Sequence, residues 1–270
     1  MYGDSEELIG RWFARDPANR AKIFLATKFG INRTGVGSAI RGDAEYVRDS
    51  VNRSLKRLGV DHIDLFYLHR PDTTTPIETT VRALKDLQDK GVIRHIGLSE
   101  CSADTIRRAA AVTQIAAYQV EYSPFFTDIE APHIGILAAA REHGIAIVPY
   151  SPLGRGLLTG KYKSIDDFDK NDFRRSVARY SVPENFAKML GLVDRLRVMA
   201  DAKGATAAQL TLAWIMAQGP DFLPIPGTSR IDNLEENLGA LRVQLTPEEV
   251  AEIRVAVEET EVPGQRYPDG

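Results

Sequence analysis

The segment IDLFYLHRPD (63–72) joins a short, largely apolar run to a group of polar residues that follows it directly. Runs of this length, rich in aromatic and β-branched residues, are typical of buried strands. We therefore predict a strand over 63–68. The polar residues His69 and Arg70 then stand just beyond its carboxyl end.

Similar apolar runs recur along the chain and alternate with longer segments of helical period. Strands are also predicted at 22–27, 93–99, 116–122, 145–150 and 222–226, and helices around 43–58, 76–90, 103–113, 130–143 and 206–218. In the first helix, apolar residues recur at spacings of three and four, and Gly59 is expected to end it as a C-cap. Apolar strands alternating with amphipathic helices predict a parallel sheet covered by helices.

This alternation fits either an open, doubly wound sheet or a closed barrel. No glycine-rich dinucleotide motif follows the first strand, and no shift in composition marks a second domain. Polar residues also gather at the strand ends, where a (β/α)8 barrel has its active site. We therefore expect an α/β protein with one barrel domain over residues 1–270, although six strands are predicted where a barrel needs eight.

Composition narrows the class of protein. The chain has 270 residues, of which 43% are hydrophobic and 26% charged, and a formal net charge of -3, so it lacks the basic footprint of a nucleic-acid-binding protein. Its one cysteine, Cys101, excludes an internal disulfide framework and a cysteine-rich metal site. The sequence has no apolar run that could span a bilayer and no leader. We expect a cytoplasmic protein without a membrane partner, and the oligomeric state is left open.

The sequence does not match several common motifs of nucleotide, metal or esterase sites. In SPLGRGLLTGKY (151–162), Arg155 stands where a phosphate loop needs glycine, Tyr162 follows Lys161, and the glycines are spaced too widely for a dinucleotide motif. They still permit a ligand to approach the backbone closely. The histidines lack the paired spacing of metal ligands, and no Gly-x-Ser-x-Gly elbow is present. We therefore expect neither a metal site nor an esterase.

The polar residues at the strand ends have ordinary alternatives when taken singly. Lys28 could be a solvated lysine, His69 a core histidine, and Arg70 with Asp72 a surface pair. Their common position favours a functional site, because all would project into one mouth of a barrel. The set comprises Lys28, His69, Arg70, Ser99, Glu100, Gln119 and Ser151.

Two later segments carry structural expectations. Residues 163–185 are polar and aperiodic, which suggests a lid over a ligand. Thr246, Pro247 and Glu249 predict a capped helix start.

The chain resembles the aldo-keto reductase family in a series of motifs that occur in the family's order. These are MYGDSEELIG, LATKFG, DLFYLHRPD, GVIRHIGLSECS, QVEYSPF, IVPYSPLGRGLLTGKY and IPGTSRIDNLEENLGA. Their details are similar to fungal and plant members grouped with pyridoxal, perakine and auxin-induced-type reductases. The resemblance implies an eight-stranded barrel that binds NADPH at the strand ends and transfers hydride reversibly to an aldehyde or ketone.

The resemblance also implies catalytic roles. Tyr2 matches the proton donor, Lys28 the residue that lowers the pKa of that tyrosine, and His69 the donor that polarises the carbonyl. The family's aspartate should lie five residues before Tyr2, where only Met1 precedes it. We expect this chain to lack the aspartate, two strands and a helix. The alternative is an impaired NADPH-binding or regulatory protein, or an incomplete gene product.

Cofactor contacts follow from the same motifs. Ser99 and Gln119 match positions that hold the nicotinamide carboxamide, while Glu100 stands where many members have asparagine. Tyr150 matches the aromatic residue that stacks on the nicotinamide. The loop along the pyrophosphate corresponds to Ser151, Leu153, Gly154 and Gly156. Ser229 and Arg230 match the site of the 2′-phosphate, and Glu236 and Asn237 contact adenine, unless NLEEN is only a polar helix start. The motifs do not identify the natural carbonyl substrate.

Overall fold

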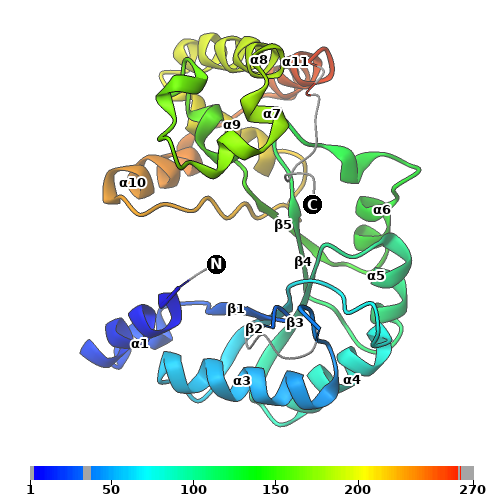
Figure 1. The fold of residues 1–270 in the computed structure, drawn as a ribbon. Coiled ribbons are helices and arrows are strands. Elements are labelled where there is room, and N and C mark those ends of the chain that lie inside the picture. The colour runs from blue at the N-terminus through cyan, green and yellow to red at the C-terminus, as the bar shows by residue number, and fades with distance from the viewer. Residues whose placement is uncertain (1–2, 33–37, 261, 263–270) are drawn as a thin grey trace. The chain divides into compact units, whose positions relative to one another are not determined.

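A computed structural model describes residues 3–32, 38–260 and 262 of the chain. Within it the chain divides into a first unit, residues 1–120 and 129–147, and a second unit, residues 121–128 and 148–270. The strands follow one another in the sheet in chain order (Figure 1). They are β1 (Ala26–Phe29), β2 (Ile63–Leu68), β3 (Ile93–Ser99), β4 (Ala117–Glu121) and β5 (Ala146–Tyr150).

The strand register in the first unit decides which side chains become neighbours. β1 to β4 pair in parallel, and Lys28, Tyr67 and Gly97 are successive partners across β1, β2 and β3. Ser99 at the end of β3 is the partner of Gln119 in β4. Because partners in a parallel ladder point to the same face, these residues share one side of the sheet.

Helices of the first unit pack along the sheet in chain order (Figure 1). They are α1 (Ser5–Arg15), α2 (Ala18–Ala21), α3 (Ala44–Leu58), α4 (Ile77–Asp89), α5 (Ala103–Ala110) and α6 (Ile136–Glu142). The chain connecting β4 to α6 includes η1 (Asp128–Glu130). In α3, Asp43 accepts a hydrogen bond from the backbone N–H of Tyr46, and Gly59 ends the helix at a φ of 64°. The predicted glycine C-cap is therefore confirmed.

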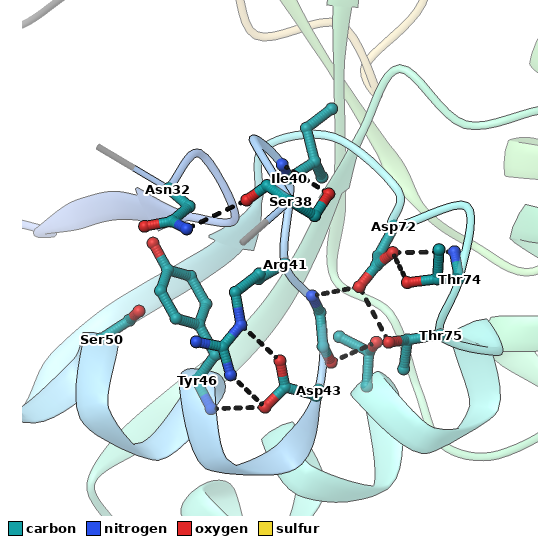
Figure 2. A network of polar contacts seen from close by, with 12 residues as sticks. Asn32, Ser38, Ile40, Arg41, Asp43, Tyr46, Ser50, Asp72, Thr74 and Thr75 are labelled. Atoms are coloured by element: carbon teal, nitrogen blue, oxygen red, sulfur yellow. Dashed lines mark hydrogen bonds and ion pairs between the residues drawn. The ribbon is translucent and has the colours of Figure 1, made fainter. Parts of the chain in front are cut away.

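A polar network joins the segments that follow β1 and β2 (Figure 2). Asp72 accepts hydrogen bonds from the backbone N–H groups of Gly42 at 2.9 Å and Thr74 at 2.8 Å, and from the Thr75 hydroxyl at 2.8 Å. Burial alone would raise the pKa of Asp72, but the hydrogen bonds from Thr74, Gly42 and Thr75 outweigh it and hold that pKa at about 2. Groups of the neighbouring loops therefore satisfy the Asp72 carboxylate.

Near the amino end of β2, a buried carboxylate fixes the start of the sheet. Asp64 accepts from the backbone N–H of Leu25 at 2.8 Å and pairs with Arg20 at 2.7 Å and Arg94 at 3.0 Å. Only 3% of its side chain is exposed. The one acidic residue inside the apolar run 63–68 is thus satisfied by three donors, as a buried charge requires.

The second unit is built around a buried helix. Its α-helices are α7 (Ala178–Ser181), α8 (Pro183–Ala202), α9 (Ala207–Met216), α10 (Ile231–Gly239) and α11 (Pro247–Glu258). Helix α9 packs against α8 and α10 and is apolar on almost every side, as expected of a buried helix. Its Trp214 stacks on Tyr122 with ring centroids 6.1 Å apart. Thr246 and Glu249 form the predicted capping box of α11.

Some boundaries differ from those predicted. The first strand covers Ala26–Phe29 instead of 22–27, and Gly135, at a φ of 65°, delays the helix expected at 130–143 until Ile136. The predicted strand at 222–226 is reduced to a bridge residue at Phe222 and one hydrogen bond of 3.0 Å from the Ile225 N–H to the carbonyl of Pro149 in β5, since Pro224 and Pro226 have no N–H to donate.

The polar segment 163–185 is not an irregular loop. It contains η3 (Ile165–Asp167), η4 (Phe173–Ser176), α7 and the beginning of α8. Among the helices of the described residues, none is long and apolar enough to cross a membrane.

Candidate active site

Lys28 and Gln119 join opposite parts of the first unit's sheet. Lys28 lies in β1, and its Nζ donates a hydrogen bond of 2.9 Å to Oε1 of Gln119 in β4. The Gln119 side chain is 6% exposed, so the amide is fixed inside the unit. The structure thus brings together a predicted catalytic residue and a predicted cofactor residue that are 91 positions apart.

Tyr67 lies between these two residues and completes the row. It is the β2 partner of Lys28, and its phenol forms a hydrogen bond with Gln119. Burial raises the pKa of Tyr67, and the hydrogen bond with Gln119 opposes that rise only partly. The ring lies directly over Gly97, where a Cβ atom would be 2.3 Å from Tyr67 Cδ1. Glycine at 97 therefore creates the space that the aromatic ring occupies.

Lys28 and His69 line one cleft of about 640 Å³ in the first unit. His69 follows β2 directly, and its backbone N–H donates to the carbonyl of Phe29 at 2.8 Å. Glu6 of α1 lines the same cleft and accepts hydrogen bonds from Thr27 at 2.7 Å and from Arg57 of α3 at 2.6 Å. Two of the three predicted catalytic residues therefore face a common space; the third, Tyr2, lies outside the described residues.

The electrostatics at the strand ends act on the lysine. Burial lowers the pKa of Lys28, and the positive charge of Arg70 lowers it further. Arg70 in turn lies 3.7 Å from the carboxylate of Glu100. A half-buried ammonium with a lowered pKa is the kind of group that active sites use in proton transfer.

Ser99 and Glu100 end β3 in different ways. Ser99 is 1% exposed and faces Gln119 on the neighbouring strand. Glu100 has a φ of 55°, and its backbone N–H donates to the carbonyl of Gln119 at 3.3 Å. Non-glycine residues in this left-handed region are uncommon, and asparagine is enriched there. The asparagine that the family resemblance implies at the position of Glu100 would adopt this conformation with less strain.

The glycine-rich loop lies in the second unit, after β5. Tyr150 is half-buried at the end of that strand, and Ser151 follows at a φ of 51°. Gly154 and Gly156 have φ values of 55° and 92°, and η2 (Gly154–Thr159) begins in this turn. Backbone bonds from Gly154 to Ser151 and from Gly156 to Leu153, both 2.9 Å, close the loop. A left-handed non-glycine residue such as Ser151 costs about 1–2 kcal/mol, so the fold must hold it in place.

A second polar set of this unit lies at the amino end of α10. Ser229 and Arg230 are exposed, and Arg230 is the N-cap residue without a side-chain cap. Its guanidinium lies 3.3 Å from Asp232 in an exposed pair. The N–H groups of a helix start carry a partial positive charge and favour an anion. One turn further on, Glu236 is half-buried and Asn237 is 9% exposed.

Sequence reasoning missed Tyr67 and the pairing of Arg70 with Glu100. Both residues of the pair are visible in the sequence, a large aromatic residue in β2 and a glycine in β3, and the structure places them opposite each other. The register that places them opposite each other follows from strand pairing, which the local pattern does not specify. Of the aromatic residues near the site, Phe29 and Phe125 are both 6% exposed and belong to the buried core.

Comparison with known proteins gives consistent matches over the whole chain. A sequence model described as the Aldo/keto reductase family matches residues 1–258. The aldo-keto reductase str7 of Strobilurus tenacellus is 56% identical over 266 residues, which are 98% of this chain and 77% of that protein. The aldo-keto reductase yakc of Schizosaccharomyces pombe, whose name specifies NADP(+), is 54% identical over 272 residues, 100% of this chain and 79% of that protein.

Solved structures agree with these matches. The glycerol dehydrogenase of Gluconobacter oxydans is similar with a TM-score of 0.86 and 28% identity, covering 98% of this chain and 81% of that one. A thermostable aldo-keto reductase in complex with epalrestat has a TM-score of 0.71 and 27% identity, covering 94% and 78%. The predicted α/β fold of the (β/α)8-barrel type is confirmed by these likenesses.

Proposed function

This chain belongs to the aldo/keto reductase family, and from that membership we propose that it reduces an aldehyde or a ketone to an alcohol with NADPH, as a single barrel domain over residues 1–270. The observation that carries the proposal is that Lys28 and His69 line one cleft, whose other residues come mainly from α1, β1 and α3. Polar groups that can bind a carbonyl oxygen and move a proton meet there. The single cysteine, Cys101, supports a cytoplasmic location as part of the same proposal.

The residues predicted to bind the cofactor carry chemical groups suited to a phosphorylated dinucleotide. Ser99 and Gln119 offer a hydroxyl and an amide on adjacent strands, suited to a carboxamide. Tyr150 at the end of β5 supplies an aromatic ring, and a ligand pyrophosphate can closely approach the backbone of the turn Ser151, Leu153, Gly154 and Gly156. The exposed Ser229 and Arg230 at the start of α10 suit a 2′-phosphate, while Glu236 and Asn237 lie on the same helix for adenine. The name of yakc supports NADP(+) as the cofactor of this chain.

The bound cofactor would supply the hydride. We assign the proton to the Tyr2 hydroxyl, which would pass it to the carbonyl oxygen as negative charge develops there. The Lys28 ammonium would favour the tyrosinate and so lower the barrier to release of that proton. His69 would donate a hydrogen bond to the same oxygen and hold it in line.

Turnover tests the chemistry. NADPH oxidation is followed with 4-nitrobenzaldehyde and with pyridoxal, an aldehyde suggested by the resemblance to pyridoxal reductases. Tyr2→Phe should lower kcat about 100-fold or more, the usual contribution of a general acid, without changing the Kd of NADPH. Undiminished turnover in Tyr2→Phe would refute the proton-donor role. NADPH binding without turnover in the unaltered chain would instead support a regulatory protein.

Cofactor selectivity tests the phosphate site separately. Arg230→Ala should weaken NADPH binding about tenfold and leave NADH binding unchanged, because only NADPH carries the 2′-phosphate. Arg242→Ala, which removes another exposed arginine of the same unit, is the matched control. Equal weakening of both cofactors by Arg230→Ala would contradict the assignment.

A further inference from the structure

The glycine-rich turn contains an arginine in a conformation that side chains rarely adopt. Arg155 has a φ of 55° and lies between Gly154 and Gly156, so three consecutive residues are in the left-handed region. The Arg155 guanidinium lies 5.0 Å from the centre of the Phe173 ring, a residue of η4. Something outside the turn must hold this backbone, because local preference opposes it.

Arg174 of η4 is a group that does so. Its Nη1 donates a hydrogen bond of 2.8 Å to the carbonyl oxygen of Arg155. The remaining nitrogens are also engaged: Nε donates to Asp172 at 3.0 Å, and Nη2 donates to Asp172 at 2.6 Å and to the Tyr162 hydroxyl at 3.1 Å. The guanidinium therefore contacts the turn through one fixed donor.

Stacking makes this donor rigid. The Arg174 guanidinium lies 4.3 Å from the centre of the Tyr162 ring and 4.1 Å from that of Phe168. Its side chain is only 12% exposed. Tyr162 also lies close to the turn, since a Cβ atom at Gly156 would be 3.3 Å from its ring and 3.6 Å from Arg174 Nη1. Arg174 and Tyr162 together leave the turn little freedom.

The neighbouring arginine has a different role. Arg175 donates to the carbonyl groups of Phe168 at 2.8 Å and Asp169 at 3.1 Å. Its side chain is 32% exposed, and both hydrogen bonds stay within the segment 168–175. Arg175 thus offers a matched control with the same charge, on the same short helix.

We propose that Arg174 is a positioning residue that fixes the Arg155 carbonyl and thereby holds the 154–156 backbone in the shape that receives the cofactor pyrophosphate. The inference rests on the proposed function. The polar segment 163–185 then has a role other than that of a lid, because through Arg174 it supports the backbone of the turn. Arg174 acts through Arg155, since each of its nitrogens already donates to a group of the protein.

The test compares two ligands that differ in the pyrophosphate. Calorimetry gives the Kd of NADP+, and displacement of NADP+ gives the Kd of adenosine 2′-monophosphate, which has the 2′-phosphate but no pyrophosphate. Arg174→Met should weaken NADP+ binding about tenfold, the scale of one charge-assisted hydrogen bond, and change adenosine 2′-monophosphate binding less than about twofold. Arg175→Met should change neither.

The outcomes are distinguishable. Equal weakening of both ligands by Arg174→Met, or no weakening of either, would overturn the inference. If Arg174→Met does not fold, Arg174→Lys keeps the charge but loses the planar fork, and it should show the same selective loss for NADP+. Failure of the unaltered chain to bind NADP+ would count against the proposed function itself.

Discussion

Lys28 and Gln119 are joined by a hydrogen bond of 2.9 Å that spans the first unit's sheet from β1 to β4. The bond ends on a neutral amide, while burial and the charge of Arg70 lower the pKa of the lysine. The charge state of Lys28 therefore depends on the residue at position 119, which can be changed without touching the lysine.

A carboxylate at this position should shift the pH dependence of the reaction. Gln119→Glu places a negative charge beside the ammonium, which favours the protonated lysine and raises its pKa. The alkaline limb of the rate profile for carbonyl reduction should then move to higher pH, whatever the effect on its height. Gln244→Glu, at an exposed position, adds the same charge and should leave the limb in place. A shift to lower pH would contradict the role of Lys28.

Gly97 should not tolerate the smallest side chain. Gly97→Ala puts a methyl group 2.3 Å from Tyr67 Cδ1, and overpacking of this kind costs about 1–3 kcal/mol of unfolding free energy. Gly191→Ala, in helix α8 with open space around the new methyl group, should instead stabilise the protein by about 0.5–1 kcal/mol. Urea unfolding of both variants measures this contrast in sign. Equal effects on the unfolding free energy would mean that the Tyr67 ring moves aside without destabilising the protein.

Protonation of Asp72 should lower the free energy of unfolding at acidic pH. Its pKa in the fold is about 2, below its value in the unfolded chain, so the carboxylate stabilises the fold above about pH 4 and loses that effect as the pH falls toward 2. Asp72→Asn should lower the unfolding free energy by about 1–2 kcal/mol at neutral pH, with the difference vanishing near pH 2. Asp49→Asn, at an exposed site on α3, is the control. A difference that stays constant with pH would rule out the ionic origin.

Asp64 should be the most sensitive acidic residue of the first unit. Asp64→Asn leaves Arg20, with 16% of its side chain exposed, beside a neutral amide and should cost about 3 kcal/mol. Asp61→Asn, three residues away with 91% of its side chain exposed, should change stability by less than about 0.5 kcal/mol. Thermal unfolding of the pair measures the difference, and similar melting temperatures would show that the network is dispensable.

The local pattern predicted the elements whose boundaries depend on local chemistry. The strands at 63–68 and 93–99 and the caps at Gly59 and Thr246 are where the sequence places them. The apolar run 22–27 was misleading because Ile23 and Phe24 are exposed and pairing begins only at Ala26. Where a strand begins is decided by its partner as well as by its own residues.

In the site, too, the features set by local sequence were predictable and those set by distant partners were not. The positions of Lys28 and His69 near strand ends were predictable, whereas the cleft that both line also takes residues from α1 and α3, which the local pattern does not place there. The contacts by which Arg174 holds the Arg155 carbonyl were not predictable. They unite Tyr162, Phe168 and Asp172 through stacking and ion pairing that have no sequence period. The roles of Tyr2 and of the cofactor residues remain predictions for the experiments above.

Glu100 keeps a left-handed backbone, at a φ of 55°, that asparagine would adopt with less strain. An exchange to asparagine would relax the chain but remove the carboxylate that lies 3.7 Å from Arg70, the residue whose positive charge lowers the pKa of Lys28. The residue at position 100 therefore sets backbone strain and the charge next to Arg70 together, so one substitution there changes both.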